Sequence, residues 1–487
     1  MSTKKGFFSG FDSFIRKLIR FLVIAIFAFS IVSVPICMLT YMRGYANLFS
    51  VRELVWAIPA LLYCALVFFA GKVFQNKKEI YLVISMLVFE AVYFVLFLVF
   101  YDTQPCSDYE GIWHAAVEMS RGTFTDGVTP GAYTYIYNWQ LGIAALESVI
   151  IRIFGEHFLA LKIFNAVVIA VNNFLVYKCC YVKFSKRTAV YAYTGAAMFI
   201  PWMLSVPQFT NHHIGFTLLL AAMLLLYKDK WYTYLFAGLL IGCLNVLRPM
   251  GLIVMIAAVC MAIYGMIKDH TFKAVLNNMG KLLSVVLAFA AVMSLFNVAF
   301  IKLGYTDINV SSARVPYFKF QKGLYGYDDI FKDFDKYENT EAYNEAMKAE
   351  LTDTVKENPK GICAFVAKKM INFLGMFDYQ FEMSFDHNDA LWSKYPIKAF
   401  YSMSWFQYLF FLVLALYAFW KTRKNREVDI FSVFFIGNTL VYLFIEAFSS
   451  YRFESYFYII MFAAAGFDLI MQKFSKKSAN KEIGDQK

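Results

Sequence analysis

The sequence carries little charge: only 17% of its 487 residues are Asp, Glu, Lys or Arg, whereas soluble proteins average about a quarter. This scarcity excludes an ordinary globular enzyme. Aromatic residues make up 19% of the chain. Disordered chains are poor in aromatic residues, so this content excludes a disordered protein. Apolar runs of roughly 18 residues or more, the length that spans a bilayer, recur from one end to the other. The sequence therefore predicts an all-α polytopic membrane protein.

No C-x-x-C pair is present, so the sequence lacks the usual spacing of a zinc or dithiol site. Most of the eight cysteines fall in or beside apolar runs, where Cys acts as a small hydrophobe. Cys106 and Cys363 fall in segments expected outside the membrane, and a disulfide between them is left open. The basic N-terminus precedes an apolar run with no small-residue cleavage site, which indicates an uncleaved first helix.

The net charge is +11, from 46 Lys and Arg against 35 Asp and Glu. Cytoplasmic loops of membrane proteins collect basic residues, and no basic patch is interleaved with base-stacking aromatics, so nucleic acid is not an expected partner. Hydropathy predicts about twelve transmembrane helices, near 21–41, 54–71, 80–101, 159–177, 189–205, 213–227, 232–247, 250–267, 282–303, 399–420, 430–447 and 455–472. The distribution of basic residues then places both termini in the cytoplasm.

Two extracytoplasmic loops divide the helices. The expected segments are three spans in 1–101, a first outer loop in 102–158, six spans in 159–303, a second outer loop or cap in 304–398, three spans in 399–472 and a basic cytoplasmic tail in 473–487. Leu141 to Phe154 is apolar but short, which favours a re-entrant or interfacial helix. In the second loop Tyr343, Met347, Leu351 and Val355 recur every four residues, as in an amphipathic helix. Asn358 and Pro359 then suit the start of a second, basic amphipathic helix.

Three carboxylates, Asp102, Asp108 and Glu110, follow the third span directly. A carboxylate held at the lip of a membrane cavity has its pKa raised by partial burial and can serve as a general base. A solvated polar loop is the plainer interpretation of the same residues.

This segment resembles a known family. Pro105-x-Ser107-Asp108 after a membrane helix, then a small-residue helix ending in Gly122 and a Pro/Tyr stretch, resembles the first outer loop of GT-C-type membrane glycosyltransferases. The resemblance is strongest to family 39, the bacterial relatives of protein O-mannosyltransferases and aminoarabinose transferases. Further similar elements follow in order: Phe154-Gly155, Ala160-Leu161-Lys162 with Asn165, Leu247-Arg248-Pro249, Glu357-Asn358-Pro359, and Glu446 with Tyr451-Arg452-Phe453. Two features depart from the family pattern, because no Pro follows Arg452 closely and three helices precede the first outer loop.

The resemblance implies an active site on the outer face of the bacterial cytoplasmic membrane and a one-step inverting reaction. The donor would be a polyprenyl-phosphate sugar, and the acceptor an envelope glycan, a glycolipid or a protein. Asp108 matches the catalytic general base, Asp102 is the alternative base, and Glu110 is a candidate to orient it or share its proton.

Cationic partners for the lipid phosphate are expected at Arg248, Arg452 and Lys162, although each could instead be a basic residue that reaches for the membrane interface. Further candidates to contact sugar or acceptor are Tyr133, Tyr135, His212 and Glu446.

No cofactor and no metal are assigned, because no fixed carboxylate and His spacing supports a metal, although some relatives use a divalent ion. Two other functions stay open. A polysaccharide polymerase of the cell envelope has a similar layout. A twelve-span transporter or flippase is of a different class, and Glu90, inside the third span, is its clearest supporting residue.

Overall fold

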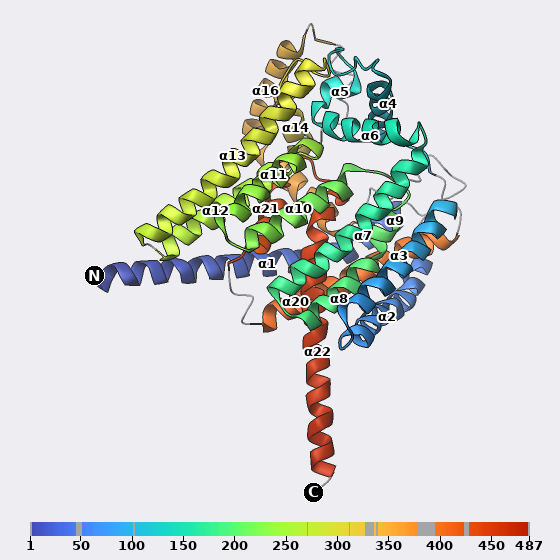
Figure 1. Ribbon diagram of the computed structural model, residues 1–487, viewed down its shortest axis with the longest axis vertical. Helices are drawn as coiled ribbons and strands as arrows, with labels where there is room; N and C mark the ends of the chain where they lie inside the picture. The colour runs from blue at the N-terminus through green and yellow to red at the C-terminus, as the bar shows by residue number, and fades with distance from the viewer. Residues whose placement is uncertain are drawn as a thin grey trace.

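The computed structural model describes residues 2–44, 51–100, 103–269, 271–310, 312–326, 336–337, 339–376, 395–422 and 428–485. Throughout these residues the regular structure is helical, and none of them forms a strand (Figure 1). The all-α prediction is therefore confirmed for the part of the chain that the structure describes.

Eight helices in the described residues are long and apolar enough to cross a membrane. They are α1 (Ser2–Gly44), α2 (Ala57–Phe74), α3 (Glu79–Phe100), α7 (Phe158–Lys183), α12 (Gly251–Asp269), α13 (Phe272–Lys302), α20 (Tyr395–Lys421) and α22 (Tyr456–Asp485). Three more helices are apolar but shorter: α10 (Asn211–Tyr227), α11 (Trp231–Leu247) and α21 (Ile430–Val441). These are the features of a helical membrane protein, with eight full-length candidates rather than the twelve expected.

The expected span at 189–205 is wrong as a single helix. The chain forms α8 (Lys186–Ala197) and then a separate short helix, α9 (Ile200–Leu204), with Pro201 in its first turn. A proline lacks the N–H that would continue the helix. The side chain of Gln407 satisfies the break, since its Oε1 accepts from the Ile200 N–H at 2.8 Å and its Nε2 donates to the Met198 carbonyl at 3.0 Å.

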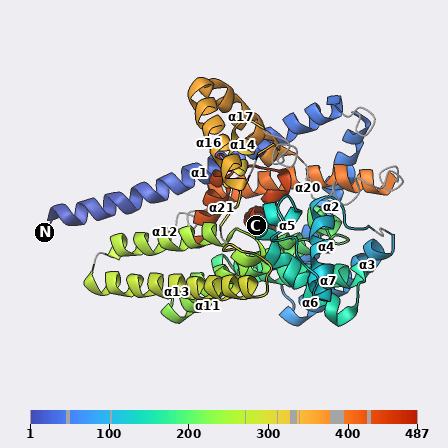
Figure 2. The same ribbon diagram turned by 90° about the horizontal axis from the view of Figure 1, so that it is seen from above.

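The helices that the sequence places outside the membrane gather at one end of the molecule. They are α4 (Asp108–Arg121), α5 (Tyr133–Ile136), α6 (Leu141–Phe154), α14 (Phe318–Leu324) and α16 (Thr340–Glu357), and we call them the cap (upper part of Figure 1). Helix α17 (Pro359–Gly375) links the cap to α1, against which it packs. Figure 2 shows α14, α16 and α17 side by side.

Several local predictions for the cap are confirmed. Helix α6 covers the apolar stretch, and α16 has the predicted amphipathic spacing, with Tyr343 and Met347 buried. Asn358 caps α17 by accepting from the Gly361 N–H at 3.0 Å, and Pro359 is its first residue. Ala115 and Ala116 are buried against α6, so the small side chains let α4 and α6 pack closely.

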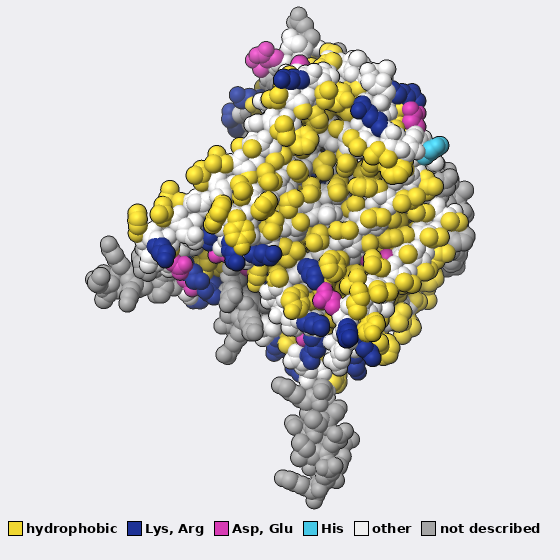
Figure 3. All heavy atoms as spheres, viewed as in Figure 1, with side chains coloured by type: hydrophobic (Ala, Val, Ile, Leu, Met, Phe, Trp, Pro, Cys, Tyr) yellow, Lys and Arg dark blue, Asp and Glu magenta, His cyan; other side chains and the backbone are white. Residues whose placement is uncertain are grey.

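The main hydrophobic core lies among α1, α7, α8, α10, α20 and α22 and is rich in buried aromatic rings, including Trp202 and Trp405. A second cluster holds α4 against α6, and a third joins α5, α14 and α16. On the face drawn in Figure 3 a belt of hydrophobic side chains separates charged side chains at the two ends. The cap therefore has a polar end of its own, beyond the apolar belt.

Candidate functional site

Asp108 begins helix α4, and the residue before it is strained. Ser107 has φ 53° and ψ −131°, outside the regions that a non-glycine residue usually adopts. Such strain costs about 1–3 kcal/mol and is found preferentially at functional sites. One turn into the helix, Gly111 lets the ring of Tyr133 come close, because a Cβ there would lie 2.9 Å from that ring. The backbone thus fixes Asp108 beside Tyr133 of α5.

The environment of Asp108 raises the pKa of its carboxyl group above the ordinary value for Asp. Burial is the largest cause, Glu446 acts in the same direction, and the ammonium groups of Lys319 and Lys322 and the hydroxyl of Tyr133 act against it. The residue as a whole is exposed, so its carboxyl group stays in contact with solvent beside these neighbours, and we call this group of residues the recess. A carboxylate at a helix N-terminus is normally stabilised in its charged form. Here desolvation outweighs that effect, as for a working base.

Glu446 is the counter-ion of both lysines. It lies between α21 and the 3₁₀ helix η4 (Ser449–Ser455) and is only 4% exposed. Its carboxylate accepts hydrogen bonds from Lys319 and, at 2.6 Å, from Lys322. Burial alone would raise the pKa of Glu446, but the two ammonium groups overcome it and hold the pKa below its usual range. Two cations therefore share one buried carboxylate and act on Asp108 as well.

The two lysines stay partly accessible, and their helix is held in place through the backbone. The side chains of Lys319 and Lys322 are 33% and 26% exposed. The Glu446 N–H donates to the Lys319 carbonyl at 3.0 Å. Gly323 allows this close contact, since a Cβ there would lie 2.4 Å from the Ile445 carbonyl carbon. A phosphate group that reached this recess would meet two ammonium groups on one helical turn.

Aromatic rings surround Lys319. Its Nζ lies 5.6 Å from the ring centre of Trp139 and 6.0 Å from that of Tyr137, and Tyr137 packs in turn against Tyr133 with ring centres 5.0 Å apart. These rings belong to α5 and to the 3₁₀ turn that follows it. The recess therefore combines a carboxylate, two cations and flat apolar faces of the kind on which sugar rings stack.

A second polar cluster is fully buried and adjoins the first. Arg248 forms an ion pair with Glu454, with 2.7 Å between its Nε and Oε1, and also contacts His212, with 3.1 Å between its NH1 and the ring Nε2. The other ring nitrogen of His212 lies 3.1 Å from the same Glu454 oxygen. Tyr451 connects the clusters, because its hydroxyl donates to Glu446 Oε2 at 3.5 Å and its ring lies beside the Arg248 guanidinium. Arg248 and His212 thus both bind Glu454, and Tyr451 packs between this cluster and Glu446.

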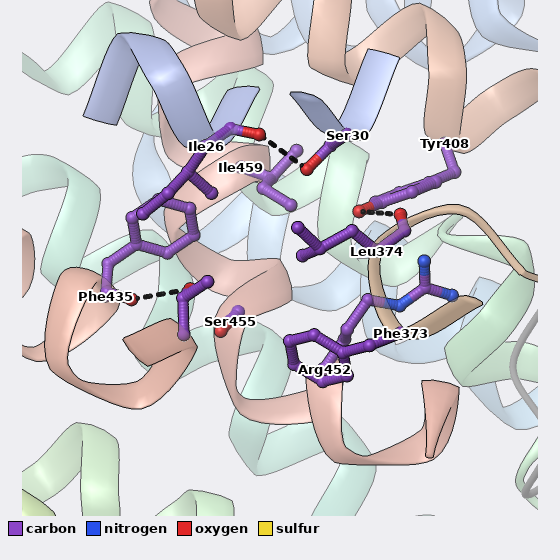
Figure 4. A pocket seen from close by; sticks show the side chains of 10 residues that line it. Ile26, Ser30, Phe373, Leu374, Tyr408, Phe435, Arg452, Ser455 and Ile459 are labelled. Atoms are coloured by element: carbon purple, nitrogen blue, oxygen red, sulfur yellow. Dashed lines mark hydrogen bonds between the residues drawn. The ribbon is translucent and has the colours of Figure 1, made fainter. Parts of the chain in front are cut away.

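Arg452 lies elsewhere, in the helical core. It is 1% exposed, donates to the carbonyl oxygens of Met376 and Ser449, and lies 4.8 Å from the ring centre of Tyr408 (Figure 4). The cavity beside it measures about 10 Å³, room for about one water molecule. This arginine therefore has no space for a phosphate group in this conformation.

The remaining predicted residues are not brought to Asp108. Glu110 points to the surface and faces His114 at 3.7 Å. Lys162 is buried on α7, with its ammonium 5.3 Å from the Phe158 ring centre. Tyr135 stacks on Arg314 in another part of the cap. Asp102 lies outside the described residues.

Two further expectations concern sulfur and metals. Cys106 is buried and Cys363 is exposed, and no disulfide joins these two described residues. Among the described residues, no three His, Cys, Asp or Glu side chains gather as a metal would require.

Comparison with known proteins adds no relative: no family model, curated protein or solved structure matches the chain. The contacts and charges around Asp108 are therefore what indicates a function.

The sequence alone missed Lys319, Lys322 and Glu454. A signal for the first two was present, since two lysines three residues apart in an aromatic segment form one face of a helical turn. Glu454 stands two residues after Arg452, and nothing local indicates that it pairs with Arg248.

Proposed function

We propose that this protein transfers a sugar from a polyprenyl-phosphate donor to an acceptor hydroxyl at the outer face of the cytoplasmic membrane. The observation that carries the proposal is that Lys319 and Lys322 share the buried carboxylate of Glu446 and that the charges of all three act on the carboxyl group of Asp108. A base with a raised pKa beside two cations suits a reaction that removes one proton and expels one phosphate.

The reaction needs one base and one anion site. Asp108 takes the proton from the acceptor hydroxyl while that oxygen attacks the anomeric carbon. The bond between this carbon and the phosphate oxygen breaks, the lipid phosphate leaves with the electron pair, and the configuration inverts. Lys319 and Lys322 neutralise the charge that develops on the leaving phosphate. Glu446 holds the two ammonium groups in place.

This assignment shifts the donor site relative to the sequence-based hypothesis. Arg248 is 7% exposed and already bound to Glu454, and Arg452 is enclosed in the core. A buried arginine that already binds protein groups has little left to offer a phosphate, whereas the side chains of Lys319 and Lys322 keep accessible surface. The lysines of α14 are therefore the better candidates for the donor phosphate.

The test is sugar transfer by purified protein in lipid vesicles. The donors are radiolabelled polyprenyl-phosphate hexose and N-acetylhexosamine, and an envelope extract supplies the acceptor. Asp108→Asn should lower transfer by about 100-fold or more, within the range of general-base catalysis. Glu110→Gln is the matched control, because Glu110 lies on the same helix turn but faces the surface, and it should transfer like the wild type.

Equal transfer by wild type and Asp108→Asn would remove Asp108 as the base. No transfer from any donor, with folded protein, would overturn the proposed activity.

A transporter is the second candidate, and one buried residue favours it. Glu90 of α3 is fully buried, its Oε1 accepts from Asn173 Nδ2 at 2.8 Å, and its Oε2 has no hydrogen-bond partner among the described residues. Ionisable residues inside membrane helices commonly mark transport pathways. In that case Glu90→Gln would abolish uptake of a labelled solute by vesicles, and Asp108→Asn would leave uptake unchanged.

A further inference from the structure

A second concave site lies in the cap, between the segment 312–317 and helix α16. Its volume is about 490 Å³, within the range of ligand sites in proteins. We call it the cap groove, and its polar lining includes Ser312, Arg314, Thr340, Asn344, Glu345 and Lys348. None of the residues that surround Asp108 lines it.

Arg314 forms the buried floor of the cap groove. It is 8% exposed, its guanidinium carbon lies 3.9 Å from the ring centre of Tyr135, and its NH2 donates to the Gly127 carbonyl at 3.2 Å and to Asp307. Its Nε is buried and finds no acceptor among the described residues. A buried charged donor left unpaired is costly, and a bound ligand or water would relieve that cost.

Asn344 contacts Arg314 and lacks a donor where Arg314 lacks an acceptor. Its Nδ2 donates to the Arg314 carbonyl at 2.7 Å, while its Oδ1 is buried with no donor among the described residues. One unused donor and one unused acceptor thus lie covered beneath the groove surface. A hydroxyl group donates and accepts at once, so it is suited to both, after a shift of these side chains that exposes the two atoms.

The walls indicate a neutral ligand. Lys348 and Arg314 supply positive charge, and Glu341, Glu345 and the Asp307 partner of Arg314 supply negative charge. A lining of mixed sign does not attract a polyanion. Tyr317 adds an aromatic ring, and Ser312 and Thr340 add hydroxyl groups. Hydroxyls, an amide, charged hydrogen-bonding groups and one ring together suit a chain of uncharged sugar residues.

The cap groove is connected to the recess through shared elements. Tyr135 lies under Arg314 and shares a hydrogen bond of 3.1 Å with Thr340, and it stands two residues after Tyr133, the neighbour of Asp108. Tyr317 of the groove stands two residues before Lys319. A ligand in the groove would therefore contact the same two segments, 133–137 and 312–322, that carry residues of the Asp108 site.

We infer that the cap groove binds the neutral oligosaccharide portion of the acceptor. Its role as an acceptor site rests on the proposed function, whereas saccharide binding itself does not. The chemistry that recognises the ligand is a run of sugar hydroxyls, paired with Arg314 and Asn344 below and with Glu345 and Lys348 at the rim.

The test is binding, measured apart from transfer. Labelled protein in lipid nanodiscs is applied to an array of neutral and acidic oligosaccharides and of unglycosylated peptides, and the strongest neutral glycan is then titrated. Glu345→Gln and Lys348→Met, both at exposed positions and so tolerated by the fold, should each weaken binding about tenfold, the effect of losing one hydrogen bond to a charged group. Asp353→Asn, exposed on the same helix but outside the groove, should bind like the wild type.

The outcomes separate the two proposals. Binding that is lost in the groove variants, without transfer from any donor, would keep the groove and overturn the proposed function. Transfer by wild type with no binding of neutral glycans, or binding unaffected by both variants, would overturn the groove. Preferential binding of acidic glycans or of peptides would overturn the ligand class.

Discussion

The Nζ atom of Lys369 lies 2.9 Å from the carbonyl oxygen of Ile445, the residue that precedes Glu446. The same ammonium group donates to the carbonyl oxygens of Gly323, which follows Lys322, and of Leu443 at 3.2 Å. Burial lowers the pKa of Lys369 to about 8, so at neutral pH it is mostly charged, with three donors for three carbonyls. Lys369 of α17 thus hydrogen-bonds to both α14, which carries Lys319 and Lys322, and the segment that carries Glu446.

Replacing Lys369 should lower the stability of the protein. In Lys369→Met three buried carbonyl groups lose their donor, and since each unsatisfied group costs about 1–3 kcal/mol, we expect a loss of at least about 3 kcal/mol in the free energy of unfolding. The measurement is thermal or denaturant unfolding of the purified protein in detergent. Lys368→Met, at the exposed neighbouring position, is the control and should unfold like the wild type. Equal stability of the two variants would contradict the role given to Lys369.

The acid limb of the pH profile of transfer should move in one direction when the charge of Lys319 is removed and in the opposite direction when the charge of Glu446 is removed. Asp108 must be ionised to act as a base, so kcat/KM falls as the pH drops through its raised pKa. Lys319 lowers that pKa, and Lys319→Met should therefore shift the acid limb to higher pH. Glu446 raises it, and Glu446→Gln should shift the limb to lower pH.

The position of the limb on the pH axis is read separately from the height of the profile, so a general loss of activity does not obscure it. Glu110→Gln serves as the reference with an unshifted limb. An acid limb at the same pH in all variants would mean that another group is the base.

Arg248 should prove structural rather than a phosphate ligand. Arg248→Met leaves Glu454 as an uncompensated buried charge, a change that typically destabilises by about 3–5 kcal/mol. The double variant Arg248→Met with Glu454→Gln removes that charge and should recover most of the loss. Unfolding of both variants in detergent checks this expectation. If Arg248→Met were as stable as the wild type but bound donor weakly, Arg248 would be a donor ligand after all.

How much of this arrangement the sequence predicts depends on the distance over which each signal acts. Local signals succeed: the four-residue spacing from Tyr343 predicts α16, and Asn358 with Pro359 predicts the start of α17. The small-residue helix that is expected after Asp108 and ends at Gly122 is α4, and it begins at Asp108 itself. In each case neighbouring residues carry the information, through periodicity or capping.

Contacts between residues that are far apart in the sequence are not predicted. The partner of Arg248 is Glu454 and that of Glu446 is Lys319, pairs far apart in the sequence and joined only by helix packing. The break before Pro201 is an intermediate case. The proline itself was visible, but the residue that makes the break stable, Gln407, belongs to another helix.

The orientation of the cap can be tested with the exposed thiol of α17, the helix that links the cap to α1. Cys363 of α17 is exposed and free, whereas Cys106 is 7% exposed and should react slowly. The proposed use of a lipid-linked donor requires that the cap faces outward. In that case a membrane-impermeant maleimide, added to intact cells without prior reduction, should label this protein at Cys363. Cys363→Ala should lose that label, because exposed Cys260 lies within the apolar span of α12 and away from an aqueous reagent. Labelling that appears only in opened cells would place the cap in the cytoplasm, where nucleotide sugars are at hand and the argument for a lipid-linked donor no longer holds.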